Sequence, residues 1–332
     1  MAKLIDVARR AGVSPATVSR ALNNVTTVDP TLAERVRAAA DELGYRPNGV
    51  ARNLRRQRTD VWALIISDIA NPFFTAVARG VEDVAQGQGF SVLLCNSDED
   101  QDKEQRYLRV AEQEQVAGVI MSPNTRGSDV SRLVNAAIPL VTVDRSSHKA
   151  ADSVMVHSRA GARDATNHLF ATGWSRPACL TGPERADTAQ ERLQGYLDAV
   201  KDARRRPAVS LVRHADFHEE SAREAMGSLL DERRPPDSVL IANATMALGA
   251  LGELNRRGIK PGRDLGLVAF DDTPWARFID PPLTVVAQPA YDIGATAARL
   301  LTERIAGTAP KRARHVRLST ELIVRASSRH IR

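Results

Sequence analysis

Three polar side chains near the amino terminus, those of Thr17, Arg20 and Asn23, recur at a spacing that places them on one face of a helix. Val18 and Leu22 lie one turn apart and are expected on the opposite, buried side. Threonine and arginine can hydrogen-bond to base edges, and arginine can bind a guanine edge with two hydrogen bonds. The pattern therefore predicts either a helix that reads DNA or an ordinary helix with a solvated polar face.

The flanking residues predict a helix-turn-helix. Apolar residues repeat at helical spacing over residues 4–11, and Gly12 ends that run as a C-terminal cap would. Ser14 followed by Pro15 is typical of an N-cap and a first helical turn, so a second helix begins almost at once. Two short helices joined by a tight turn form the unit whose second helix enters the major groove of DNA.

A third helix completes a small bundle. Asp29 and Pro30 predict its start, and Gly44 its end. Its expected buried stripe consists of Leu32, Val36, Ala39 and Leu43.

The next short segment predicts a hinge. Residues 48–56 are too few to stay helical alone in water, so we expect them to fold only against DNA or a second copy. Leu54, an apolar residue among arginines, suits a side chain that wedges into a minor groove.

The distribution of charge supports DNA binding independently. The chain carries 46 basic and 40 acidic side chains, a net charge of +6. Residues 1–58 alone hold eleven Lys/Arg and five Asp/Glu, so the whole excess lies at the end with the helix-turn-helix pattern. Basic side chains bind phosphates by releasing condensed counterions, which predicts salt-dependent binding to DNA.

Other features of the whole sequence argue against a secreted protein, a membrane protein and a common α/β enzyme. With 332 residues the chain exceeds one typical domain, and it shows no secretory signal or membrane-spanning run, so we expect a cytoplasmic protein. Cys95 and Cys179 lie in strand-like runs and are expected to be buried, reduced thiols. The glycine-rich phosphate loops and the nucleophile elbow of common α/β enzymes are missing, so we expect no catalytic residues and no cofactor. His214 and His218 are four apart but flank a loop, and we expect no metal site.

From Val61 onward, short apolar runs alternate with helical stretches, one of which is expected over Arg192–Lys201. A strand is expected over Leu211–Arg213. This alternation predicts an α/β core of doubly wound parallel sheets. Its length favours two similar lobes, with a ligand at the carboxyl ends of the strands.

Ordered motifs along the whole chain make it resemble the lactose-repressor (LacI/GalR) family of bacterial transcription regulators. The resemblance rests on Asp6–Ser14 with Thr17–Arg20, Gly44–Asn48, Ala51–Leu54, Asn71–Phe74, Glu191–Tyr196, Phe270–Asp272, Pro281–Thr284 with Gln288, and Leu322–Ser327. It implies a homodimer that binds a pseudo-palindromic operator in double-stranded DNA. It also implies an all-α helix-turn-helix head and a core like that of periplasmic sugar-binding proteins, closing on a small effector.

The resemblance also implies domain boundaries. The head comprises residues 1–47, the hinge helix and linker 48–60, and the two-lobed effector-binding and dimerisation core 61–332. The first lobe comprises about 61–158 and 289–318, and the second about 159–288 and 319–332.

The resemblance also implies candidate binding residues, at the positions that match the family's motifs. We predict DNA contacts from Ser14, Thr17, Ser19, Arg20, Asn23, Tyr45, Asn48, Ala51, Arg52 and Leu54. We predict effector contacts from Asp68, Phe73, Phe74, Asp144, Arg145, Arg192, Phe217, Asn243, Asp271 and Gln288. Such a lining offers donors, acceptors and an apolar wall, which suits a sugar. Each residue also has a plainer interpretation, because Asp68 or Asp271 could cap the next helix, and Phe74 or Phe217 could be core.

Three departures from the family pattern affect these expectations. Ala244 stands where relatives often carry an acid, and Pro15-Ala16 offer no side-chain hydrogen bonds to bases. His157 lies at an expected lobe crossover, where a helix-cap or hinge role is favoured over ligand binding.

Two alternatives to a sugar-controlled repressor remain open: a corepressor-type regulator responding to a purine or other non-sugar metabolite, and a solute-binding protein without a regulatory role.

Overall fold

The computed structural model describes residues 2–22, 28–45, 59–146, 151–205 and 208–330 of the chain. The chain divides into two compact units, Met1–Arg58 and Thr59–Arg332, and each is described on its own. The hinge expected over residues 48–56 lies outside the described ranges.

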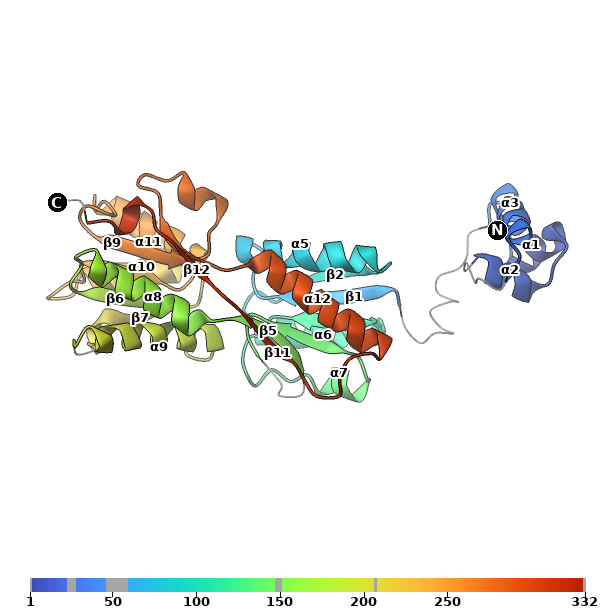
Figure 1. Ribbon diagram of the computed structural model, residues 1–332, viewed down its shortest axis with the longest axis horizontal. Coiled ribbons are helices and arrows are strands. Elements are labelled where there is room, and N and C mark those ends of the chain that lie inside the picture. The colour runs from blue at the N-terminus through green and yellow to red at the C-terminus, as the bar shows by residue number, and fades with distance from the viewer. Residues whose placement is uncertain (1, 23–27, 46–58, 147–150, 206–207, 331–332) are drawn as a thin grey trace. The chain divides into compact units, whose positions relative to one another are not determined.

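The described residues of the first unit form helices α1 (Leu4–Ala11), α2 (Pro15–Leu22) and α3 (Pro30–Glu42) (Figure 1). Gly12 caps α1 in the left-handed conformation, with φ of 66°. The Ser14 hydroxyl accepts a hydrogen bond of 3.1 Å from the Thr17 amide, which begins α2. The Asp29 carboxylate accepts from two backbone amides at the start of α3. These caps supply partners for amides that a helix start otherwise leaves without any.

The core of this unit differs in one respect from the expected stripe. Val36 and Ala39 are buried as predicted, but Leu43 is exposed and Leu32 only half-buried. Helix α3 ends at Glu42, so Leu43 is its capping residue and does not continue the stripe. Nine small or branched side chains form the core: Val7, Ala8, Ala11, Val18, Ala21, Ala33, Val36, Ala39 and Ala40.

The second unit contains two six-stranded sheets, and the predicted doubly wound α/β fold is confirmed. The first sheet has the order β11-β5-β4-β3-β1-β2. Its strands are β1 (Val61–Ile66), β2 (Ser91–Asn96), β3 (Gly118–Met121), β4 (Leu140–Val143), β5 (Asp152–Val156) and β11 (His315–Leu318). The second sheet has the order β12-β10-β9-β8-β6-β7. Its strands are β6 (Pro177–Thr181), β7 (Val212–His214), β8 (Ser238–Ile241), β9 (Gly266–Phe270), β10 (Thr284–Ala287) and β12 (Glu321–Ile323).

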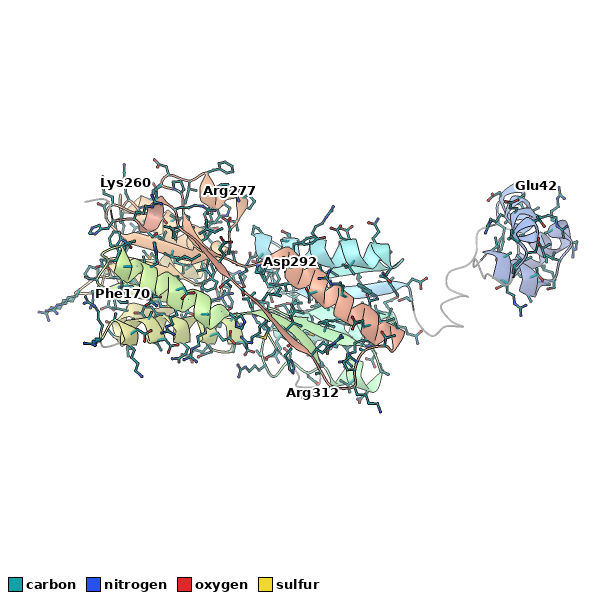
Figure 2. The ribbon with its side chains drawn as sticks, in the orientation of Figure 1. Glu42, Phe170, Lys260, Arg277, Asp292 and Arg312 are labelled. Atoms are coloured by element: carbon teal, nitrogen blue, oxygen red, sulfur yellow. The ribbon has the colours of Figure 1, made fainter. Side chains whose placement is uncertain are left out.

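Every strand pair is parallel within the described residues except β10 with β12, which is antiparallel. The two sheets and their helices are here called the first and second lobes. The chain passes between them after β5, after β10 and after β11 (Figure 1). Asp292, in the first turn of α12 just after the second of these crossovers, is labelled in Figure 2.

Within the described part of this unit, eight α-helices flank the sheets. They are α5 (Pro72–Gly87), α6 (Gln101–Gln113), α7 (Ser131–Asn135), α8 (Ser158–Ala171), α9 (Asp187–Asp202), α10 (Glu219–Leu230), α11 (Ala244–Arg256) and α12 (Ala290–Ala306). Helices α5 and α12 pack together on the first lobe, and α8 and α9 on the second (Figure 1). Gly195 lets α9 approach α8, because a Cβ there would lie 2.1 Å from the Arg159 carbonyl oxygen.

Two element boundaries expected from the sequence are wrong. Helix α9 begins at Asp187 and not at Arg192. The negative charge of Asp187 stabilises this earlier start, because the amino-terminal end of a helix carries a partial positive charge. A short 3₁₀ helix (Val209–Leu211) precedes β7, so that strand begins at Val212 instead of Leu211.

Both cysteines are buried free thiols, as expected. Burial raises the pKa of Cys95 to about 11. Across the described ranges, no helix is both long and apolar enough to cross a membrane.

Candidate effector pocket and DNA-reading helix

The carboxyl ends of parallel strands from both lobes bring polar side chains to one place. Asp144 and Arg145 follow β4 in the first lobe. Asn243 follows β8 and Asp271 follows β9 in the second. Ligands of such sheets bind at these strand ends, so the topology itself places a candidate site between the lobes.

All ten predicted effector residues lie around one cavity. It is lined by Asp68, Asn71, Phe73, Phe74, Glu99, Asp144, Arg145, Thr188, Arg192, Phe217, His218, Asn243, Asp271 and Gln288. The cavity measures about 20 Å³, room for roughly one water molecule. A larger ligand therefore requires these side chains or the lobes themselves to move apart.

A cluster of buried charges forms the floor of the pocket. Arg192 is 3% exposed, Asp271 5% and Asp144 8%. The Arg192 guanidinium lies 4.2 Å from the centre of the Phe270 ring and donates to the carbonyl oxygen of Ala242. Arginine holds such a position because it stacks on aromatic faces and stays charged.

Burial and neighbouring charges shift the pKa values in this cluster in opposite directions. Burial raises the pKa of Asp144, although Arg145 and Arg192 oppose the shift. Burial raises the pKa of Asp271 as well, and Arg192 again opposes it. Burial lowers the pKa of Arg192, while Asp144 and Asp271 favour its charged form. The three groups therefore depend on one another for their charge.

A second buried arginine lies beside this cluster. Arg145 donates to both carboxylate oxygens of Glu99, at 2.6 and 2.8 Å, and both side chains are less than a tenth exposed. Burial alone would lower the pKa of Arg145, but Glu99 raises it overall. The Arg145 guanidinium also lies 5.0 Å from the centre of the Phe217 ring, which belongs to the other lobe.

Three predicted ligand residues also accept hydrogen bonds from backbone amides, but neither Asp68 nor Asp271 caps the helix that follows it, because Asn71 and Thr273 hold those N-cap positions. Asn243 accepts from the Met246 amide at 2.7 Å and so begins α11. Asp271 accepts from the Ala244 amide at 3.2 Å and from Gln288 at 2.5 Å. Asp68 accepts from the Ala70 amide at 2.8 Å in the loop after β1. These hydrogen bonds fix the carboxylate and amide groups in place without removing all of their hydrogen-bonding capacity.

Part of the hydrogen-bonding capacity of the pocket lining is unused. Among the described lining residues, the Nε atoms of Arg145 and Arg192 and the Oε1 atom of Gln288 are buried without a hydrogen-bond partner. Arg145 Nε nevertheless lies 3.4 Å from a carboxylate oxygen of Asp144, at ion-pair distance. Buried polar atoms ordinarily find hydrogen-bond partners, so these three atoms are unusual. Asp144, Phe217 and Asp271 have φ of 62°, 74° and 77°. Such backbone strain in non-glycine residues concentrates at ligand sites.

Sequence reasoning missed four lining residues: Asn71, Glu99, Thr188 and His218. Asn71 was part of a quoted motif and caps α5 through the Phe73 amide, at 3.0 Å. Thr188 was missed because α9 was expected to begin later. Glu99 stands in the acidic run 98–100, which looks like solvated surface, and no local signal in the sequence reveals its pairing with Arg145.

Of the predicted DNA-reading residues, Thr17, Ser19 and Arg20 lie on α2, and Ser14 directly precedes it. Ser14 and Arg20 are exposed, and Thr17 and Ser19 are half-buried. The hydroxyls of Ser14 and Thr17 are 2.9 Å apart, and Tyr45 packs against the core of the unit. Asn23, Asn48, Ala51, Arg52 and Leu54 lie outside the described residues. Among the predicted DNA contacts on α2, Arg20 therefore has the longest side chain, and its guanidinium is an exposed hydrogen-bond donor.

Comparison with known proteins identifies two domains in the chain. Residues 3–48 match the model of the bacterial regulatory proteins, lacI family, and residues 166–328 match that of the periplasmic binding protein-like domain. The chain is 36% identical over 329 residues to a ribose operon repressor of Halalkalibacterium halodurans, covering 99% of this chain and 98% of that protein. It is 34% identical over 330 residues to the repressor CytR of Escherichia coli K12, covering 99% and 96% of the two chains.

Solved structures give the same result. The lac repressor dimer bound to operator and the anti-inducer ONPF superposes with a TM-score of 0.85 at 27% identity, covering 98% of this chain and 99% of that one. The transcriptional regulator CelR in complex with cellobiose gives a TM-score of 0.76 at 33% identity, covering 98% and 100%. The chain therefore belongs to the lacI family of bacterial regulatory proteins and is a DNA-binding transcriptional repressor.

Proposed function

We propose that the repressor is controlled by a sugar or sugar derivative bound between the two lobes of the core. The observation that carries this proposal is the lining of the pocket, where buried arginines and carboxylates stand beside the rings of Phe73, Phe74 and Phe217. Sugar hydroxyls both donate and accept, so they can satisfy Arg145 Nε, Arg192 Nε and Gln288 Oε1 together. The relative named as a ribose operon repressor and the regulator solved with cellobiose support this ligand class.

The small cavity supports a link between effector and lobe arrangement. With about 20 Å³ available, a monosaccharide cannot enter while the lobes and side chains stand as they do. Binding then favours one lobe arrangement over another, and an effector shifts operator affinity only through that difference. In this proposal residues 1–47 read DNA, residues 48–60 transmit the change and residues 61–332 hold the effector.

A thermal-shift panel tests the ligand class. We expect a sugar to raise the melting temperature of the full chain, because a ligand selective for the folded state stabilises it by about 2.7 kcal/mol at a hundred times its Kd. The panel includes ribose, glucose, cellobiose, adenine, guanine and hypoxanthine. The stabilisation should vanish in Asp271→Asn and persist in Asp198→Asn, whose carboxylate pairs with Arg159 away from the pocket.

A purine is the second candidate ligand, because aromatic rings line the pocket and a PurR repressor of Vibrio atlanticus is 32% identical over 308 residues. Stabilisation by a nucleobase alone would overturn the sugar proposal in favour of this one.

We also propose that two copies pair through the first lobe. Leu93 and Leu94 on the edge strand β2, with Ile69 nearby, are exposed apolar side chains. An apolar edge strand left open invites association, so a partner is expected to cover it. The lac repressor structure that superposes on this chain is a dimer on operator.

The mass in solution tests this pairing. We expect light scattering at micromolar concentration to give twice the chain mass of 36.1 kDa, and Leu94→Glu to reduce it to one chain. A wild-type mass of one chain or of four chains would contradict the proposal.

A further inference from the structure

The first two turns of α9 carry two kinds of side chain. Thr188 and Arg192 line the effector pocket. Asp187 and Glu191, one residue earlier in each turn, bind side chains of the first lobe. Residues four apart lie on the same face of a helix, so the pocket residues and the interlobe residues form two adjacent stripes.

We propose that Asp187 and Glu191 are positioning residues that tie α9 to the first lobe and hold the pocket in its narrow form. The proposal rests on the proposed function only in treating the cavity as the effector site. Neither residue is among the predicted ligand contacts, and neither needs to touch the effector.

Asp187 makes the more buried of the two connections. Its side chain is 4% exposed and binds the guanidinium of Arg126. Its other carboxylate oxygen accepts a hydrogen bond of 2.8 Å from the Ser146 hydroxyl. Ser146 directly follows Asp144 and Arg145, so Asp187 anchors the strand end that supplies two pocket residues. Separating the lobes would break both contacts at once.

Glu191 makes the second connection. Its carboxylate accepts from both terminal nitrogens of Arg317, at 2.8 and 3.2 Å. Arg317 lies in β11, which pairs with β5 at the edge of the first sheet. This two-pronged pair is more directional than a single contact, because both carboxylate oxygens are engaged. It also fixes the turn of α9 that presents Arg192 to Asp144 and Asp271.

The same helix provides a matched control. Farther along α9, Asp198 and Asp202 pair with Arg159 and Arg163. Both of these arginines lie on α8, within the second lobe. Removing those two carboxylates therefore changes the charge of α9 equally but breaks no contact between lobes.

The separation of the lobes can be measured without effector or DNA. Spin labels are placed through Glu114→Cys in the first lobe and Arg233→Cys in the second, both exposed positions, while the native cysteines are buried. Labelled full-length chain is diluted in an excess of unlabelled chain so that only distances within one copy contribute. We expect Asp187→Asn with Glu191→Gln to shift the distance distribution and broaden it, and Asp198→Asn with Asp202→Asn to leave it unchanged. Identical distributions in wild type and both double variants would overturn the proposal.

Exchanging the charges of Glu191 and Arg317 distinguishes a specific role of this ion pair from a general effect of mutating α9. Glu191→Gln alone should broaden the distribution, and Glu191→Arg with Arg317→Glu should narrow it again because the pair is rebuilt in reverse. A swapped variant as broad as Glu191→Gln would overturn the role of Glu191. Because neither sugar nor DNA is present, a failed sugar panel leaves this measurement intact, and unchanged distances leave the sugar assignment intact.

Discussion

Replacing Arg192 by methionine is expected to lower the free energy of unfolding of the core by about 3–5 kcal/mol, because removing one member of a buried charge cluster leaves its partners uncompensated. Asp144 and Asp271 would remain buried with their nearest shared cation gone. Urea unfolding of the full chain measures the change. Arg159→Met is the control, since its pair with Asp198 is more than half exposed on the arginine side and such solvent-exposed pairs contribute little to stability.

The same variant carries a prediction about pH. Burial already raises the pKa of Asp144 and Asp271, and loss of Arg192 should raise both further. A carboxyl group with a raised folded-state pKa binds its proton more tightly when folded, so its contribution to stability is lost as pH rises through that pKa. The loss of unfolding free energy caused by Arg192→Met should therefore be smaller at pH 5 than at pH 8. Equal deficits at the two pH values would show that Arg192 is not what compensates these carboxylates.

Arg20→Ala is expected to weaken binding to operator DNA by about 1–3 kcal/mol and to change binding to random DNA little, as for an arginine that pairs with a guanine edge. The side chain is exposed on α2, free of the Ser14–Thr17 contact that occupies the neighbouring hydroxyls. Fluorescence anisotropy at one fixed salt concentration measures both affinities, with the operator taken from selection among random duplexes. Arg35→Ala, an exposed arginine on α3, is the control. Equal losses on both DNAs for Arg20→Ala would assign it to phosphate instead.

The sequence allowed the pocket to be predicted where topology determines position. Asp144, Asn243 and Asp271 each follow a short apolar run, and parallel strands place such residues at one edge of a sheet. The assignment of all these residues to ligand binding came from the family resemblance, which also supplied Arg192 on α9 and Gln288 directly after β10. The position of a residue could therefore be predicted from the sequence where that residue directly follows a strand of a parallel sheet.

It failed where position depends on contacts between distant segments. Glu99 is part of an acidic run, and only the fold shows that it turns inward to meet Arg145. The first turn of α9 was missed because its N-cap residue is Ala186, whose methyl side chain cannot accept a hydrogen bond and so gives no capping signal in the sequence. Leu43 fits a helical stripe by spacing, but the helix ends one residue before it. Such outcomes are set by tertiary packing, which spacing alone does not encode.

The most direct test of the account is operator binding by the full-length chain with and without the sugar that stabilises it most, measured by anisotropy at one salt concentration. We expect saturating sugar to change operator affinity by about 5- to 150-fold, the usual range of coupling between two sites, and to leave affinity for random DNA unchanged. Arg192→Met should abolish the response, and Asp198→Asn should retain it. An operator affinity that stays the same while the sugar saturates the core would contradict the claim that this pocket controls the repressor.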